Sequence, residues 1–262
     1  MSSSSAAAAP AMRSGVWDDS VVDDDTIEHL RQTHRLPDTN LVRARAPPAG
    51  EIRPAPEEGE RVIFRLHLMR GLVLPASGFF RSFLEFNGLQ PHHLTPNIVV
   101  LLAAFATLCE GFLGVLPTIE LWGEFFQSKL GTHVAGIPAQ CGAFIAMRRS
   151  TTDNPFPSIA LIKSVKMWQQ SYFYMKNVAP EGDWVNLPHY EAGTPAGRLP
   201  SWSHRAETLT PAGTAAMCTR EMPHAEVANM VNHIANCELA ADWEFGKEPY
   251  SRANPPPVNP LI

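Results

Sequence analysis

The sequence predicts an α+β fold with a mainly helical core, a few short strands and disordered N- and C-terminal tails. The hydrophobic share of the 262 residues is 45%, which is enough for a sizeable core. Apolar residues with helical or strand-like spacing concentrate between positions 61 and 180. The 24 prolines are nearly twice the usual share and cluster in the flanking parts. We therefore expect the folded region at about residues 60–245.

Residues 1–60 are predicted to be a disordered, acidic and Pro-rich tail. They hold few large apolar residues whose burial would offset the entropy of ordering the chain. A Ser/Ala run, an acidic run and a Pro-rich stretch follow one another at positions 1–11, 18–25 and 47–56. One short helix is expected within the tail, because Asp25 or Thr26 can cap it and Ile27 and Leu30 share a face.

The domain predicted at residues 61–180 is expected to begin with a strand and a helix. Between Arg61 and Leu68, apolar residues alternate with mostly polar ones, which is typical of a half-buried strand. Residues 78–87 carry large apolar side chains on one helical face, and Gly88 is a suitable end for that helix.

The next helix has the clearest start in the chain. Thr95 is a good N-cap, Pro96 is a preferred first helical residue, and the apolar run 98–109 follows. Because this run is apolar all round, we expect it to be buried on most faces. The alternative is a membrane span over 98–116, but Glu110 lies inside that stretch and neither end has a basic flank. No membrane partner is therefore expected.

The second half of the domain is expected to contain one more helix and two strands. The helix covers residues 119–130 and ends at Gly131. Short apolar or aromatic runs at 143–147 and 171–175 predict the strands.

The C-terminal part is predicted to pack on this domain and then to end in a tail. Residues 181–245 read as an irregular segment followed by a terminal helix from about 223 to 243. Residues 246–262 are Pro-rich and are expected to be a tail.

Several short motifs follow one another through the middle of the chain in a particular order and spacing. They are Phe64-x-x-His67-x-x-Arg70-Gly71-x-x-Leu74-Pro75, Phe79-Phe80, Gly88-Leu89-Gln90-x-x-His93-Leu94-Thr95-Pro96-Asn97, Cys109-Glu110-x-Phe112-Leu113-Gly114-x-x-Pro117, Leu121-Trp122, Phe125-Phe126, Lys166-x-Trp168-Gln169 and Phe173-Tyr174-x-Lys176-Asn177. Together they resemble the gypsy-type transposon domain family of plant proteins, over roughly residues 61–180. The resemblance departs from the family pattern at Met167, where we expect a glycine, and at Tyr172, where we expect a tryptophan.

The resemblance implies a coding remnant or a component of a plant mobile element, without an established reaction, substrate or cofactor. The motifs of retroelement enzymes are absent from the sequence. There is no Tyr-x-Asp-Asp, and Asp38-Thr39-Asn40 fails as a protease motif because its third residue is not glycine. The acidic cluster 18–25 lies in the predicted tail, where it reads as a solvated patch and not as a two-metal site. Without a nucleotide-binding glycine motif, no cofactor and no enzyme activity are expected.

Candidate metal and acid–base residues are interpreted as structural. Cys218, His224, His233 and Cys237 are the nearest approach to a zinc set, but their spacing is too loose for a compact site. His67, His92 and His93 titrate near neutral pH in general, yet no nucleophile motif accompanies them. We expect neither a catalytic residue nor a metal ligand.

The cysteines and the first residues predict an intracellular protein, nuclear or cytoplasmic. Cys109, Cys141, Cys218 and Cys237 are widely spaced, which is typical of free thiols in a reducing compartment. The stretch 1–11 lacks the basic and apolar regions of a secretory signal. It has a weak likeness to a plastid transit peptide, against which the acidic run that follows argues.

Charge is distributed unevenly and suggests one candidate binding face. Residues 1–60 have a net charge of −5, residues 61–180 of +5 and residues 181–262 of −5. Within 148–176, aromatic residues alternate with cations, and cations neutralise phosphates while aromatic rings stack on bases. The candidate nucleic-acid-binding residues are Arg148, Arg149, Lys163, Lys166, Trp168 and Lys176.

Two readings of this face remain. One is an amphipathic strand pair with aromatic residues inside and cations outside, in a non-catalytic structural or interaction protein derived from a plant retrotransposon. The alternative is a nucleic-acid-binding accessory protein that uses the basic and aromatic face at 148–176. The sequence leaves the partner unknown, with a nucleic acid and a protein as the two candidates, and it indicates no small-molecule substrate.

Overall fold

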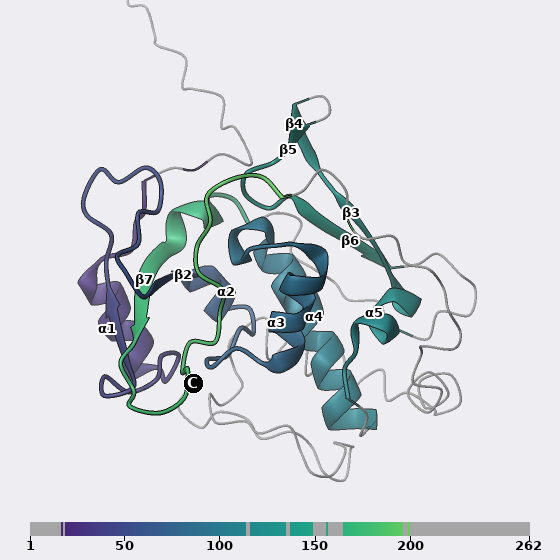
Figure 1. Cartoon of the computed structure of the whole chain (residues 1–262), viewed down its shortest axis with the longest axis horizontal. Coiled ribbons are helices and arrows are strands. Elements are labelled where there is room, and N and C mark those ends of the chain that lie inside the picture. Colours follow the sequence, from purple (N-terminus) through teal and green to yellow (C-terminus); the bar gives the residue numbers. More distant parts are fainter. Residues whose placement is uncertain are drawn as a thin grey trace, which may run out of the picture.

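The computed structural model describes residues 17, 19–113, 116–134, 137–148, 156, 165–195 and 199 (Figure 1). The α-helices are α1 (Asp24–Gln32), α2 (Arg65–Leu68), α3 (Gly78–Asn87), α4 (Pro96–Thr107) and α5 (Ile119–Phe125). Short helical turns are η1 (Pro91–His93), η2 (Leu108–Leu113) and η3 (Trp168–Ser171). The strands are β1 (Val42–Arg45), β2 (Glu60–Phe64), β3 (Phe126–Leu130), β4 (Thr132–Val134), β5 (Ile137–Pro138), β6 (Phe144–Arg148) and β7 (Tyr172–Asn177). The predicted α+β class is confirmed, but the described part divides between helices and three antiparallel sheets and is not mainly helical.

The largest sheet has the order β1-β7-β2, with β7 in the centre. β1 runs antiparallel to β7, with Val42 opposite Asn177. β2 runs antiparallel along the other edge of β7, with Phe64 opposite Tyr172. The central strand therefore comes from late in the chain and both of its partners come from the first quarter, a pairing that no local pattern in the sequence predicts.

A side-chain clamp crosses this sheet from one outer strand to the other. The guanidinium of Arg45 on β1 lies 4.2 Å from the centre of the Tyr174 ring on β7. It then makes two hydrogen bonds to the carboxylate of Glu60 on β2, at 2.7 and 2.6 Å. Because Glu60 is almost completely buried, this paired geometry satisfies a charge that would otherwise destabilise the fold.

α3 and α4 form the helical centre of the described structure; α3 has both predicted ends, and α4 has the predicted start. The Ser77 hydroxyl accepts from the Phe80 N–H, and Gly88 ends α3 in the left-handed conformation at φ 61°. The Thr95 hydroxyl accepts from the Ile98 N–H, and Pro96 is the first residue of α4. These caps satisfy backbone groups that the helices leave unpaired at their ends.

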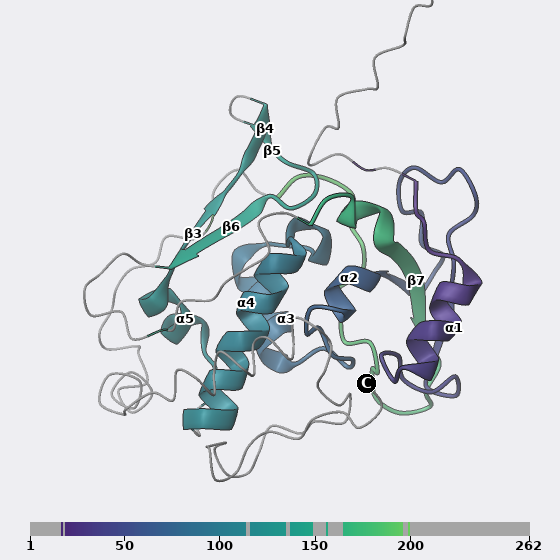
Figure 2. The same cartoon turned by 180° about the vertical axis from the view of Figure 1, so that it is seen from behind.

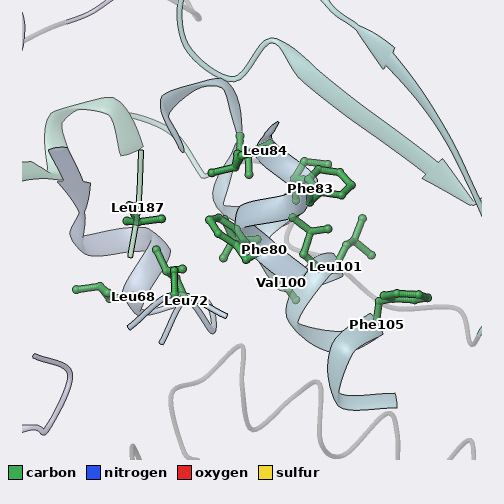
Figure 3. Close-up of a cluster of buried hydrophobic side chains, with 14 of the residues drawn as sticks. Leu68, Leu72, Phe80, Phe83, Leu84, Val100, Leu101, Phe105 and Leu187 are labelled. Carbon is green, nitrogen blue, oxygen red and sulfur yellow. The ribbon is translucent and has the colours of Figure 1, made fainter. Parts of the chain in front are cut away.

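A continuous apolar core joins the helical centre to α2 and to the irregular segment after β7 (Figure 3). The labelled side chains belong to one core cluster and come from four parts of the chain: Leu68, Leu72, Phe80, Phe83, Leu84, Val100, Leu101, Phe105 and Leu187. Leu101 and Phe105, on α4, are 8% and 0% exposed. The expected burial of this helix is therefore confirmed, and no helix in the described ranges has the length and hydropathy needed to cross a membrane.

The helix predicted over 119–130 is wrong in its second half. α5 ends at Phe125, and the chain continues as β3, which pairs antiparallel with β6. The predicted strand at 143–147 is confirmed as β6. Pairing with a strand 14 or more residues away decides this outcome, together with the Phe126 ring, which stacks on Trp122 with the ring centres 4.0 Å apart.

The strand predicted from Arg61 to Leu68 is also too long. β2 ends at Phe64, and the next four residues form α2. Both His67 and Leu68 are buried there. Two consecutive residues can share a buried surface in a helical turn, whereas in a strand they would face opposite sides of the sheet.

The prediction of a disordered tail at 1–60 is wrong for the part that the structure describes. α1 and β1 form between residues 19 and 60, and Ile27, Leu30 and Val42 belong to the main core. The short helix is confirmed, but its N-cap is Asp23. These few apolar residues are buried because β1 pairs with β7 and the residues around β7 pack against them. Amino-acid composition did not predict this burial, because it gives the number of apolar residues and not the distant residues that they contact.

The remaining predictions fall partly beyond the described residues. Residues 178–195 contain no helix or strand, in line with the predicted irregular segment. The terminal helix expected at 223–243 and the tail at 246–262 lie outside the described residues, as do positions 1–16.

Met167 adopts the left-handed backbone conformation, with φ 57° and ψ 20°. This is the position where the family resemblance calls for a glycine. A side chain at such a φ costs about 1–2 kcal/mol, which glycine avoids. The departure from the family pattern therefore falls on a residue whose backbone still has the conformation that glycine prefers.

We expect Phe105→Ala to lower the free energy of unfolding by about 3–5 kcal/mol, because the ring is fully buried and leaves a cavity. It lies between aromatic neighbours, with ring centres 5.4 Å from both Phe79 and Trp122. Denaturant unfolding measures the change. Val73→Ala is the control, since Val73 is 58% exposed and should change stability by less than about 0.5 kcal/mol. Equal effects of the two substitutions would contradict the buried position of α4.

We expect Met167→Gly to raise the free energy of unfolding by about 0.5–1 kcal/mol. Relief of the left-handed strain exceeds the extra entropy that glycine gives the unfolded chain. Met167→Ala keeps the Cβ atom and should show no such gain. A loss of stability in the glycine variant, measured by the same denaturant titration, would be the contrary result.

Candidate functional site

Three of the five predicted nucleic-acid-binding cations lie in the described part of the chain, on different elements. Arg148 is exposed at the end of β6, Lys166 is exposed just before η3, and Lys176 is exposed on β7. Arg149 and Lys163 lie outside the described residues. β7 and β6 belong to different sheets on opposite sides of α3 and α4 (Figures 1 and 2). The two segments are therefore not the amphipathic strand pair that the sequence suggested.

The aromatic members of the predicted face are turned into the core. Trp168 is 5% exposed, and its ring centre lies 5.1 Å from that of Phe64 and 5.3 Å from that of His67. Tyr172 and Tyr174 are fully buried. In this arrangement no face of Trp168 is open for a base to stack on. Alternation of buried and exposed residues along β7 could not predict this burial, because β7 is the central strand and both of its faces are covered.

The feature that sequence reasoning missed is a buried cluster of histidines and aromatic rings beside the sheet. His67 is fully buried between Phe64 and Trp168. Its Nε2 lies 3.1 Å from the Leu94 carbonyl oxygen, which can only accept, so Nε2 carries the hydrogen. Burial lowers the pKa of His67 to about 3, which keeps the ring neutral at physiological pH.

His92 and His93 lie side by side on η1 and share one acceptor. The Gln90 N–H donates to His93 Nδ1 at 2.9 Å, so His93 Nε2 carries the hydrogen and points at the Gly193 carbonyl oxygen, 3.3 Å away. His92 Nε2 lies 3.5 Å from the same oxygen. Burial lowers the pKa of His92 to about 3 and that of His93 to about 4. Both rings therefore tie the segment around residue 193 to η1 and remain neutral.

Trp17, from the N-terminal part of the chain, also belongs to the cluster. Its ring is 6% exposed and is enclosed by four rings: Phe64, His92, Tyr172 and Tyr190, at centre distances of 6.0, 5.4, 5.7 and 6.0 Å. We call these four residues the aromatic cage. The sequence signal for it is a tryptophan, together with Val21 and Val22, inside an acidic stretch.

A pocket of about 470 Å³ opens next to the cluster, between the end of α3 and the segment 188–195. Its lining carries both signs of charge and one histidine: Arg81, Glu85, Gln90, His93, Glu191 and Thr194. Both ring nitrogens of His93 are already engaged by backbone groups. A histidine held in this way orders the pocket wall and has no free nitrogen with which to move a proton of a ligand.

The thiols in the described part are also buried. Neither Cys109 nor Cys141 forms a disulfide within the described residues. Burial raises the pKa of both, and nearby Glu110 adds to the effect at Cys109. A raised pKa keeps a thiol protonated and unreactive. Among the described residues, no three His, Cys, Asp or Glu side chains gather closely enough to hold a metal ion.

Residues 62–130 match a family model described as "Putative gypsy type transposon". This segment, about a quarter of the chain, is similar to that family. The match begins in β2 and ends with β3, so it takes in the helical centre and η1 with its two histidines. Neither the curated proteins nor the solved structures gave a match to the chain.

The gypsy-type segment is shorter than the 61–180 range over which the sequence motifs suggested the resemblance. η3 and β7, which carry the predicted aromatic segment, follow it in the chain. The gypsy-type segment nevertheless depends on them, because its first strand, β2, pairs with β7. The cluster is thus assembled from the family segment and from residues on both sides of it.

We expect stability to fall as the pH decreases from 6 to 5. An unfolded histidine takes up a proton near pH 6.5, whereas the pKa values of His67, His92 and His93 in the folded protein are about 3, 3 and 4. The unfolded state therefore binds more protons in this window, and each histidine contributes up to about 1.4 kcal/mol per pH unit. The three together contribute up to about 4 kcal/mol per pH unit.

Denaturant unfolding at several pH values measures this slope. His67→Gln keeps an N–H donor toward the Leu94 carbonyl but cannot titrate, so its slope should be smaller by about a third. The same slope in this variant and in the wild type would show that His67 is not held neutral by the fold.

Proposed function

We propose that this chain is a non-catalytic structural or interaction protein derived from a plant retrotransposon. The main support for the proposal is that the histidine and cysteine side chains named above are engaged in the fold and not available for catalysis. The three buried histidines hydrogen-bond to backbone carbonyls, and both described thiols are buried with raised pKa values. The match of residues 62–130 to a gypsy-type transposon family supports the origin.

The three buried histidines lack the properties that a catalytic acid or base requires, which supports the non-catalytic part of the proposal. A general acid or base needs a pKa near the working pH and a path to the proton that it moves. His67, His92 and His93 have pKa values of about 3 to 4, and their donors are already bonded within the protein. Such side chains stabilise the arrangement of η1, α2 and the segment around Gly193.

The alternative is a nucleic-acid-binding accessory protein. Its candidate cations in the described residues are exposed, but Trp168, the ring on which a base would stack, is buried. The Nζ of Lys176 donates to the Glu58 carbonyl oxygen at 2.9 Å, and Trp168 is enclosed by the core. Binding would then depend on phosphate contacts alone, which are sequence-independent and sensitive to salt. The proposed interaction role is favoured over it for this reason.

A fluorescence-anisotropy titration with single-stranded RNA and DNA at several salt concentrations separates the two roles. We expect no binding at micromolar protein and low salt. If the alternative holds, binding appears and weakens with salt by about 0.7 log units per tenfold salt for each phosphate neutralised. The double variant Arg148→Ala/Arg149→Ala would then lower the slope by about 1.4.

The matched control is Arg43→Ala/Arg53→Ala, which removes the same charge from exposed positions on and near β1. An equal effect of the two double variants would indicate a nonspecific charge effect. Trp168→Ala should lower stability and leave any salt slope unchanged, because its ring packs inside the protein. Salt-dependent binding whose slope only the first double variant lowers would contradict our proposal.

A further inference from the structure

The pocket between the end of α3 and the segment 188–195 has two walls of different kinds. One wall follows a single face of α3 and consists of Arg81, Leu84, Glu85 and Gly88. The opposite wall is the segment 188–195, which contains no helix or strand. The volume of about 470 Å³ lies within the range of about 300–1,000 Å³ in which protein pockets hold ligands. The pocket is therefore large enough for one long side chain of a partner.

Two carboxylates in this lining have no partner within the described part of the chain. Glu85 and Glu191 are both exposed, and neither side chain makes a hydrogen bond or an ion pair with another described residue. Arg81, in contrast, is held by Asn186, because its Nη1 donates to the Asn186 Oδ1 at 2.6 Å. Since His93 is neutral, two carboxylates against one guanidinium leave the lining with a net charge of −1. This balance favours a cationic ligand.

Two further features of the lining favour a ligand that is positively charged and donates hydrogen bonds. The C-terminal end of α3, at Gly88, carries the negative end of the helix dipole. The Oε1 atom of Gln90 is buried and has no hydrogen-bond partner among the described residues. A buried acceptor without a partner is costly, and an N–H donor brought in beside Gln90 removes that cost.

The apolar part of the lining suits the stem of an arginine. An arginine side chain has a flexible apolar stem and a charged guanidinium, so the stem can pack on apolar residues while the guanidinium reaches the carboxylates. Its five N–H donors form a planar fork that can bond two carboxylates at once, unlike the compact ammonium of lysine. Five apolar side chains line the pocket: Leu84, Leu89, Pro188, Ala192 and Pro195.

The opposite wall favours an arginine that belongs to a polypeptide. Among the described residues, no backbone N–H of the segment 188–195 donates to a backbone carbonyl. A chain segment with unpaired N–H and C=O groups can pair with the backbone of an extended peptide. A free amino acid would use the charged groups of the pocket and not this wall.

We propose that this pocket binds an arginine side chain of a partner polypeptide that lies extended along the segment 188–195. The guanidinium pairs with Glu85 and Glu191, and the stem packs on Leu84 and the apolar residues around it. The inference deepens the proposed interaction role and rests on it. It assigns the chemistry of the partner: a peptide segment with an exposed arginine.

An NMR titration of the full-length chain with a blocked pentapeptide, acetyl-Gly-Ala-Arg-Ala-Gly-amide, tests the pocket. The amide signals of Gly88, Glu191 and Thr194 should shift, with a Kd of about 1 mM or below. The matched peptide carries citrulline, which has nearly the same shape without the charge, and should bind about ten times more weakly. Equal binding of the two peptides, or no shift at about 10 mM peptide, overturns the proposal.

Charge removal from the chain tests the assigned carboxylates. The double variant Glu85→Gln/Glu191→Gln should bind the arginine peptide about ten times more weakly and the citrulline peptide as before. Both side chains are exposed, so the variant keeps the fold. The control is Glu58→Gln/Glu181→Gln, which removes the same charge from exposed positions outside the pocket. An equal loss in both double variants would mean a general charge effect and overturn the site.

The free amino acid arginine, titrated in the same way, separates a polypeptide partner from a small molecule. It should bind more weakly than the pentapeptide, because it makes no backbone pairing with the segment 188–195. Binding as tight as that of the pentapeptide would overturn the polypeptide assignment. None of these titrations contains nucleic acid, so a failure here and a failure of the proposed function are told apart.

Discussion

The antiparallel pairing of β7 with β1 and β2 is the interaction on which the rest of the described structure depends. β7 supplies the backbone partners for both outer strands, and the carbonyl of its first residue, Tyr172, accepts a hydrogen bond from the Ser20 hydroxyl. It also contributes Tyr172 to the aromatic cage and Tyr174 to the clamp between Arg45 and Glu60. Strands far apart in sequence close large loops, so their pairing is stable only when the burial and hydrogen bonds around it offset the entropy of closure.

The histidine and aromatic cluster follows from this sheet. β2 leads directly into α2, which places His67 against Phe64 and Trp168, and η1 then brings His92 toward Trp17. Each of the three histidines donates to a backbone carbonyl that has no partner in a sheet or helix. The carbonyl of Leu94 is buried and would be costly without a partner, and a neutral His67 both satisfies it and fills space beside aromatic rings. The cluster is therefore explained by packing, and its low pKa values are a consequence of that packing.

The family segment is not a structural unit by itself. Residues 62–130 contain the helical centre, whose caps and apolar faces are local. The partner of β2, however, is β7, and the partner of β3 is β6, and both lie beyond residue 130. The N-terminal residues, too, are part of the same core. The aromatic cage around Trp17 accordingly combines Phe64 and His92 from inside the family segment with Tyr172 and Tyr190 from outside it.

The sequence by itself determined the elements whose causes are local. The ends of α3 and α4 follow from Ser77, Gly88, Thr95 and Pro96, since a capping hydroxyl, a left-handed glycine and a proline act within a few residues of themselves. The burial of α4 follows from its uniform apolar composition. Only the tertiary structure decided the rest: where α5 gives way to β3, that residues 19–60 fold, and that Trp168 faces inward. Each of these depends on a partner more than ten residues away, and the free energy of such a contact is set by a neighbour that a local pattern does not contain.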